Sequence, residues 1–247
     1  NEETVGQTAF DYVLKSPWDT RVFHNDAPMN TVQCPKPADD LLINIPDRLE
    51  NGDVDEKTWT SLSDISNKIN RLSDQAVSEG SFGAASCVLD YLLFWAQKDA
   101  FIVDNECRQG GDHWEHGYDR SNFINGILAI PYLQIRNAST LDETKRSVVL
   151  SWFESLYLCS RTRAEGMLLN AQKNGYGPHN QLYPALLAVA TIAIALDQPD
   201  EFNWAIEKYQ QSIDTISADG TSVNEVAHKM GWTLHYHTLI VNFSVHL

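Results

Sequence analysis

Apolar residues recur at helical spacing along most of the chain from residue 57 onward. Between residues 58 and 79 they follow one another three or four positions apart, at Trp59, Leu62, Ile65, Ile69 and Leu72. The same kind of pattern predicts further helices over 82–102, 120–136, 140–163, 181–197 and 198–217, and from residue 224 onward. Because alternation with a period of two is almost absent, the sequence predicts an all-α fold.

The predicted helices come in pairs in which one member is more hydrophobic than the other. A helix that is apolar on most of its surface is expected to be buried on most of its surface. The pairing therefore favours the inner and outer shells of an α/α toroid over a four-helix bundle. Thr140 or Asp142 is expected to cap the helix that follows it, and polar loops are predicted over 105–119 and 170–180.

The first 56 residues differ from the rest of the chain in being rich in Pro, Asp and Asn. This composition predicts a loop-rich arm and lid over 1–56, with one short helix near residues 8–15. A helical toroid is predicted over 57–247. Since no composition break divides the chain, we predict a single domain over 1–247.

Charge and hydropathy exclude several classes of partner. The formal net charge of −15 would repel a nucleic-acid backbone or an anionic membrane at long range, so we expect no nucleic-acid partner. The longest apolar run, 186–196, falls short of the roughly 18 residues that a membrane span needs, so we predict a buried helix there and no membrane insertion. A few cations in a cleft would still allow an acidic substrate.

The four cysteines are far apart and form no CxxC pair, which argues against a zinc knuckle and against a redox motif. Disulfides or free buried thiols remain as alternatives. An even count suits an exported protein. The chain begins without a basic start or an apolar signal region, so an export signal either has been removed or was never present. We expect a secreted or periplasmic protein.

Several segments, in this order, resemble the alginate lyase family, polymannuronate-cleaving polysaccharide lyases built on an α/α toroid. They are VQCPKPADDLL (32–42), AASCVLDYLLFWAQKDAFI (84–102), RSNFINGILAIPYLQIR (120–136), VVLSWFESL (148–156), ALLAVATIAIALDQPDEFNWAIEKY (185–209) and DGTSVNEVAHKMGWTLHYH (219–237). The resemblance covers about Cys34 to His237. It implies a polyuronate lyase on a toroid, with a disulfide between Cys34 and Cys87.

The family's motifs carry over in part. Its Asn-Asn-His, before the long apolar helix, places the second Asn on Asn180, but Gln181 stands where the family has His, and His179 lies on the other side. The family's final helix has an Arg seven residues before a Tyr. Here the Tyr is Tyr236 and the Arg is replaced by Lys229, in a register that needs one extra residue after Glu225. These departures leave polymannuronate and polyglucuronate open as substrates.

The residue types suit the chemistry that the resemblance implies. Cutting a β-1,4-linked uronate removes the C5 proton and expels the C4 oxygen, so the neighbouring carboxylate must be neutralised by donors such as Asn180 with Gln181 or His179. In mannuronate and glucuronate both groups lie on one face of the ring, so Tyr236 could take the proton and return it. Its reference pKa of about 10 must then fall near cations. Lys229, about two helical turns away, is suited to this, and His228 is a rival donor.

The segment HWEHGYDR (113–120) allows two interpretations. His113 and His116, with Glu115 or Asp119, could ligate a metal, but a Gly-rich loop does not fix their spacing and no third His is near in sequence. We therefore expect no metal and no cofactor. Substrate contact is the better use, with Trp114 or Tyr118 stacking on a sugar and Arg120 clamping a carboxylate. Arg48, in the predicted lid, could do likewise.

Other assignments remain open at this point. Tyr236 could be a packing residue, Asn180 a helix cap and Lys229 a solvated surface charge. A toroid glycoside hydrolase would need two carboxylates, for which Asp112, Asp119 and Glu225 are candidates. A polysaccharide-binding domain that has lost activity is a third class. The chain ends eleven residues after Tyr236, so it is either a fragment or a natural short form.

Overall fold

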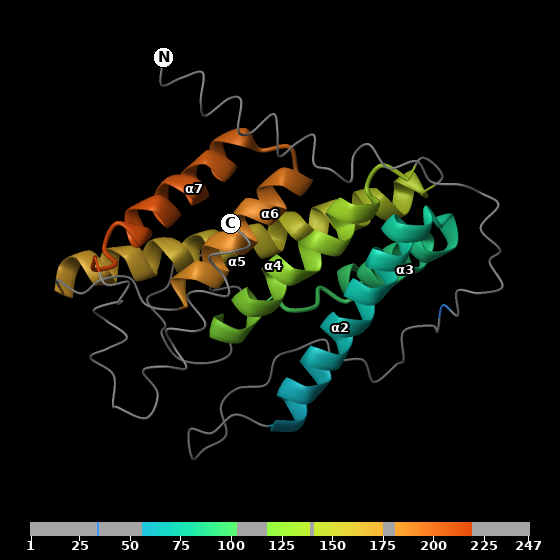
Figure 1. The fold of residues 1–247 in the computed structure, drawn as a ribbon, viewed down its shortest axis with the longest axis horizontal. Helices are drawn as coiled ribbons and strands as arrows, with labels where there is room; N and C mark the ends of the chain where they lie inside the picture. The colour runs from blue at the N-terminus through green and yellow to red at the C-terminus, as the bar shows by residue number, and fades with distance from the viewer. Residues whose placement is uncertain (1–33, 35–55, 103–117, 139–140, 175–180, 219–247) are drawn as a thin grey trace.

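The computed structural model describes residues 34, 56–102, 118–138, 141–174 and 181–218, which form six helices and no strand. The helices are α2 (Glu56–Glu79), α3 (Phe82–Ala96), α4 (Tyr118–Ile135), α5 (Glu143–Asn174), α6 (Leu182–Ala195) and α7 (Pro199–Ile213) (Figure 1). The all-α prediction is confirmed, with one helix for each predicted segment in this part of the chain. The helices predicted near residues 8–15 and after residue 224 lie outside the described residues.

The helices pack in two layers. In one layer α4 lies between α2 and α6, and in the other α3 contacts α5, while α7 packs against α6. Helix α6 lies against α4, α5 and α7, and all fourteen of its residues are buried. The apolar run over 186–196 is therefore a buried core helix, as predicted. No helix in the described ranges is both long enough and apolar enough to cross a membrane.

Helices α4 and α6 are parallel to each other. Gly126, midway along α4, lies against Leu187 and Ala188 of α6. The Arg136 side chain, just after the last residue of α4, donates a hydrogen bond of 3.2 Å to the carbonyl oxygen of Ile194. Helices α2, α4 and α6 all begin at their lower ends in Figure 1 and run upward to the right. Helices α5 and α7 run the opposite way. This alternation is the one expected of a toroid.

Local contacts explain where helices begin. The Asp142 carboxylate accepts the backbone N–H groups of Thr144 and Lys145, at 2.8 and 3.2 Å, and so caps α5. Of the two predicted caps, Asp142 is thus confirmed. Ser81 caps α3 in the same way, because its hydroxyl accepts the N–H of Ala84 at 3.2 Å.

The end of α3 and the start of α4 differ from the positions predicted from the sequence. Helix α3 ends at Ala96 rather than at residue 102, because the chain turns through Asp99 and Phe101, both at positive φ, and buries Ala100 and Phe101. The Trp152 indole N–H holds this turn by donating to the Ala100 carbonyl at 2.8 Å. Helix α4 begins at Tyr118, inside the loop predicted over 105–119.

Helix α5 continues to Asn174, five residues into the loop predicted over 170–180. Ala164 and Met167 pack against the start of α6, which holds this end of α5 in place. No Gly or Pro interrupts the chain between Leu168 and Asn174, and Ala171, Gln172 and Lys173 favour a helix. The polar composition that suggested a loop therefore belongs to a solvent-facing last turn.

The predicted disulfide between Cys34 and Cys87 is present, with an S–S distance of 2.04 Å. Cys87 is buried on α3 and Cys34 is exposed, so the bond fastens a point of the N-terminal segment to the core. Cys159 on α5 is also disulfide-bonded. No free thiol occurs among the cysteines that the structure describes.

Candidate functional site

The two polar segments singled out in the sequence, at 113–120 and 179–181, lead into α4 and α6, and these two helices start side by side. Gly126 meets Ala188 eight residues into α4 and six residues into α6. At a rise of about 1.5 Å per residue, the first residue of α4 lies about 12 Å from this contact and that of α6 about 9 Å from it, on the same side. We call the first turns of α4 and α6, residues 118–121 and 182–185, the helix-start face. It is the candidate site.

The start of α6 is suited to binding an anion. Gln181 occupies the N-cap position and is half-buried, and its side chain makes no capping hydrogen bond. The first turn of α6 carries no acidic residue. The first backbone N–H groups of a helix lack partners within the helix, and the helix dipole adds partial positive charge there. A carboxylate is therefore favoured at this position.

Neighbouring helices hold the start of α6 in place. Ala164 and Met167 of α5 are buried in one cluster with Leu182, Ala185 and Leu186 of α6. Tyr183 packs edge-on against Tyr209 of α7, with ring centroids 6.3 Å apart. Since α5 and α7 cover α6 from two sides, the helix-start face has a rigid base.

The structure describes only some of the predicted site residues. Only Gln181 is described with its side chain, at the N-cap of α6. Tyr118 and Arg120 are placed by their backbone in the first turn of α4. The others lie outside the described residues and remain predictions; they are Arg48, Trp114, His179, Asn180, His228, Lys229 and Tyr236.

One buried polar residue near the site was missed from the sequence. Asn125 of α4 is fully buried, and its side-chain amide donates to the Ser160 hydroxyl of α5 at 3.2 Å. Its amide oxygen has no hydrogen-bond partner among the described residues. The available signal was an Asn in the middle of an otherwise apolar helix pattern. The Asn125–Ser160 contact ties α4 to α5 about two turns behind the helix-start face.

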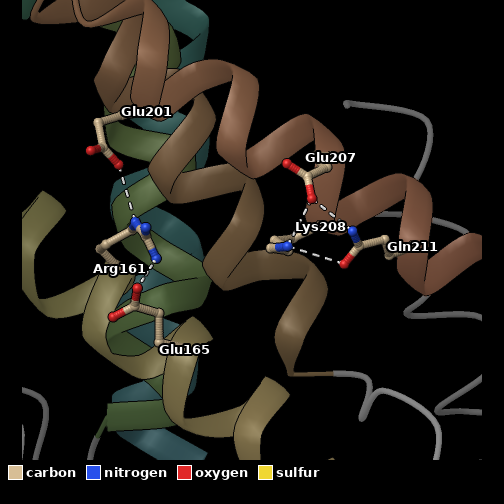
Figure 2. Close-up of polar contacts among 6 residues, drawn as sticks. All are labelled: Arg161, Glu165, Glu201, Glu207, Lys208 and Gln211. Carbon is tan, nitrogen blue, oxygen red and sulfur yellow. Dashed lines mark hydrogen bonds and ion pairs between the residues drawn. The ribbon is translucent and has the colours of Figure 1, made fainter. Parts of the chain in front are cut away.

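Among the described residues, a network of charged side chains lies between α5 and α7. Arg161 pairs with Glu165 and with Glu201, the latter at 3.1 Å (Figure 2), and its guanidinium lies 3.2 Å from the centre of the Trp204 ring. Burial, together with a hydrogen bond to Glu201, raises the pKa of the nearby Tyr157 well above its ordinary value. A phenol that stays protonated is unsuited to act as a base, so this network is structural.

Metal binding is not indicated in the described ranges. No group of three or more His, Cys, Asp or Glu side chains there could hold a metal ion. The alternative metal site at His113 and His116 lies outside them and stays untested.

Comparison with known proteins agrees with the family resemblance. The sequence model of the family described as Alginate lyase matches residues 47–242. An alginate lyase of Cobetia marina is 22% identical over 167 residues, which cover 66% of this chain and 41% of that protein. An alginate lyase of Pseudomonas putida (strain W619) is 24% identical over 194 residues, covering 76% and 49%. The chain spans about half the length of the curated relatives it matches.

Solved structures agree on the fold. Alginate lyase A1-III from Sphingomonas species A1 superposes with a TM-score of 0.62 at 19% identity, covering 97% of this chain and 68% of that one. A variant of the same lyase complexed with a tetrasaccharide gives 0.62 at 20% identity, covering 98% and 68%. The fold is thus the α/α toroid that the helix pairing predicted. Because the family model matches well over half of its residues, the chain belongs to the alginate lyase family.

Proposed function

We propose that this chain is a polysaccharide lyase that cleaves a β-1,4-linked polyuronate by syn β-elimination, with mannuronan-type alginate ahead of polyglucuronate. One observation carries the proposal: the family match over 47–242 runs through both candidate motifs, at 179–181 and 228–236. The second of the solved structures above, complexed with a tetrasaccharide, supports a sugar-binding role for this kind of toroid.

The proposed reaction needs no cofactor. The Tyr236 phenolate takes the C5 proton, the electrons of that bond form the C4–C5 double bond, and the bond from C4 to the glycosidic oxygen breaks. The same phenol then returns the proton to the leaving oxygen. Charge that develops on the C5 carboxylate is stabilised by donors at the start of α6, namely Asn180 with Gln181 or His179, and by the N-terminus of that helix.

The two departures from the family motif are expected to tune this site. Gln181 is a neutral donor at every working pH, whereas the family's His gains charge as the pH falls. Lys229 is a point charge where the family has the planar fork of an Arg. Restoring the family residues, as Gln181→His and Lys229→Arg, should therefore raise the preference for polymannuronate over polyglucuronate. Initial rates on the two polymers measure that preference.

Substrate contacts are proposed on the α4 side of the helix-start face. Trp114 or Tyr118 would stack on a sugar ring, and Arg120 would pair with a uronate carboxylate. Arg48 and His228 would supply further donors. Together with the anion-favouring start of α6, these groups would give the acidic chain a local site for an acidic polymer.

The disulfide supports a proposal on location. Structural disulfides persist in oxidising compartments, and the Cys34–Cys87 bond is formed in this chain. We therefore propose that the protein is secreted or periplasmic, where it would meet an extracellular polysaccharide.

The deciding experiment incubates the purified chain separately with polymannuronate, polyguluronate and polyglucuronate. A lyase yields an ultraviolet-absorbing unsaturated end without consuming water, a hydrolase yields saturated reducing ends, and a binding domain yields neither. Tyr236→Phe should abolish the signal. Tyr91→Phe is the matched control, because the Tyr91 hydroxyl is buried without a hydrogen-bond partner among the described residues. Polyguluronate as the best substrate would contradict the one-sided proton transfer.

A further inference from the structure

The backbones of α4 and α6 approach each other closely at Gly126, where the two helices cross. A Cβ atom placed on Gly126 would lie 3.1 Å from the backbone nitrogen of Ala188, 3.2 Å from Cγ of Leu187 and 3.3 Å from Cα of Ala188. Ordinary van der Waals contact begins near 3.4 Å. Two of these three atoms are backbone atoms of a fully buried helix, so they cannot rotate aside as a flexible side chain would.

This crossing sets the spacing of the helix-start face. Gly126 lies about 12 Å from the first residue of α4, and Ala188 about 9 Å from the first residue of α6. Beyond the crossing, the far ends of both helices are joined by the hydrogen bond from Arg136 to the Ile194 carbonyl. Within the crossing, the Thr191 hydroxyl lies 3.4 Å from the Gly126 carbonyl oxygen. The two helices are therefore joined at one end and in the middle, so a wider crossing separates them most on the side of the site.

We infer that Gly126 is a positioning residue for the lyase reaction, setting the distance between the substrate-contact side on α4 and the charge-stabilising side on α6. The inference rests on the proposed function. Under that function, Tyr118 and Arg120 hold the sugar from the first turn of α4, while Gln181 and the start of α6 meet its carboxylate. A change in the separation of the two helix starts would misplace the reacting sugar without removing any contacting group.

The geometry gives the size of the effect. A methyl group at Gly126 must separate the backbones at the crossing by about 0.3–0.5 Å to reach ordinary contact. Measured along α6, the crossing lies about 9 Å from the Ile194 hydrogen bond and the helix start about 18 Å from it. Pivoting about that bond doubles the added separation, to about 0.6–1 Å between the two helix starts. A misplacement of this size costs about 10- to 100-fold in rate when reacting groups must meet in a near-attack geometry.

The test compares Gly126→Ala with Gly166→Ala. Gly166 lies on the exposed face of α5, and a Cβ there would meet nothing within 4 Å, so it controls for the general effect of alanine in a helix. We expect Gly126→Ala to lower kcat by about 10- to 100-fold and to change KM by less than about threefold, because a polymer is bound through many contacts while proton transfer needs one alignment. Gly166→Ala should keep the wild-type kcat and raise the melting temperature slightly.

Each outcome distinguishes this inference from the proposed function. If no polyuronate gives an unsaturated product with the wild-type chain, the proposed function fails, and this inference with it. If the wild type is active and folded Gly126→Ala keeps its kcat, only the positioning role is refuted. An equal loss in both glycine variants also refutes it. Should Gly126→Ala not be recovered as a folded protein, the same substitution is measured in the Gly166→Ala background, whose added helix stability offsets the crowding.

Discussion

The Cys34–Cys87 disulfide should account for a large share of the stability of this chain. The bond links residues 53 positions apart. In the chain-entropy model, closing a loop of that length restricts the unfolded state by about 4 kcal/mol, between the values of about 3 for 15 residues and 4.7 for 100. Domain stabilities are commonly only about 5–15 kcal/mol, so losing this bond would remove a quarter or more of the total.

The perturbation is the double variant Cys34→Ser/Cys87→Ala. A serine suits the exposed position of Cys34 and an alanine the buried position of Cys87, and neither leaves an unpaired thiol. A reducing agent would not isolate the effect, because it would also open the disulfide of Cys159. Urea denaturation followed by far-ultraviolet circular dichroism measures the free energy of unfolding. We expect a loss of about 4 kcal/mol and, at about 2–4 °C per kcal/mol, a melting temperature lower by about 8–16 °C.

The slope of the denaturation curve provides an internal check. An unfolded chain without the cross-link is more expanded, so the m-value should rise as stability falls. A loss of less than about 1 kcal/mol with an unchanged m-value would refute the reasoning, since the N-terminal segment would then be adding no constraint to the unfolded state.

Three further predictions concern packing and charge. Arg161→Met should cost about 2–3 kcal/mol in urea denaturation, because it leaves Glu201 without its cationic partner at a largely covered site. Lys208→Met, which breaks an exposed pair with Glu207 (Figure 2), should change stability by less than about 0.5 kcal/mol. Equal costs for the two would contradict this ranking. Trp152→Phe should cost about 1–3 kcal/mol, because a buried carbonyl loses its donor, and a thermal melt would show whether it does. The pKa of Tyr157 is raised in the folded state, so its contribution to stability is complete below its ordinary value of about 10 and is lost as the pH rises above that. Tyr157→Phe should therefore reduce the fall, at alkaline pH, in the free energy of unfolding measured with urea. An unchanged fall would refute the assignment.

The sequence predicted less of the candidate site than of the fold. The pattern of the family located Gln181 at the start of α6, and the structure agrees with that position. It could not show that the segment before α4 leads to the same face, because that depends on the contact between Gly126 and Ala188, which are 62 positions apart. Asn125 was missed for the same reason, since only the packed state shows that its partner is Ser160.

The sequence by itself determined which segments are helices and which helix is buried, because spacings of three and four residues and a wholly apolar run act locally. It also limited the cap of α5 to Thr140 or Asp142, and the structure shows that Asp142 makes this contact, within three residues. The tertiary structure decided where α3 and α5 end, because the turn held by Trp152 and the packing of Ala164 and Met167 on α6 are contacts between distant segments. It likewise decided that α4 and α6 start at one face. Helix periodicity carries no information about which helices become neighbours, and that choice is made by shape and burial in the packed core.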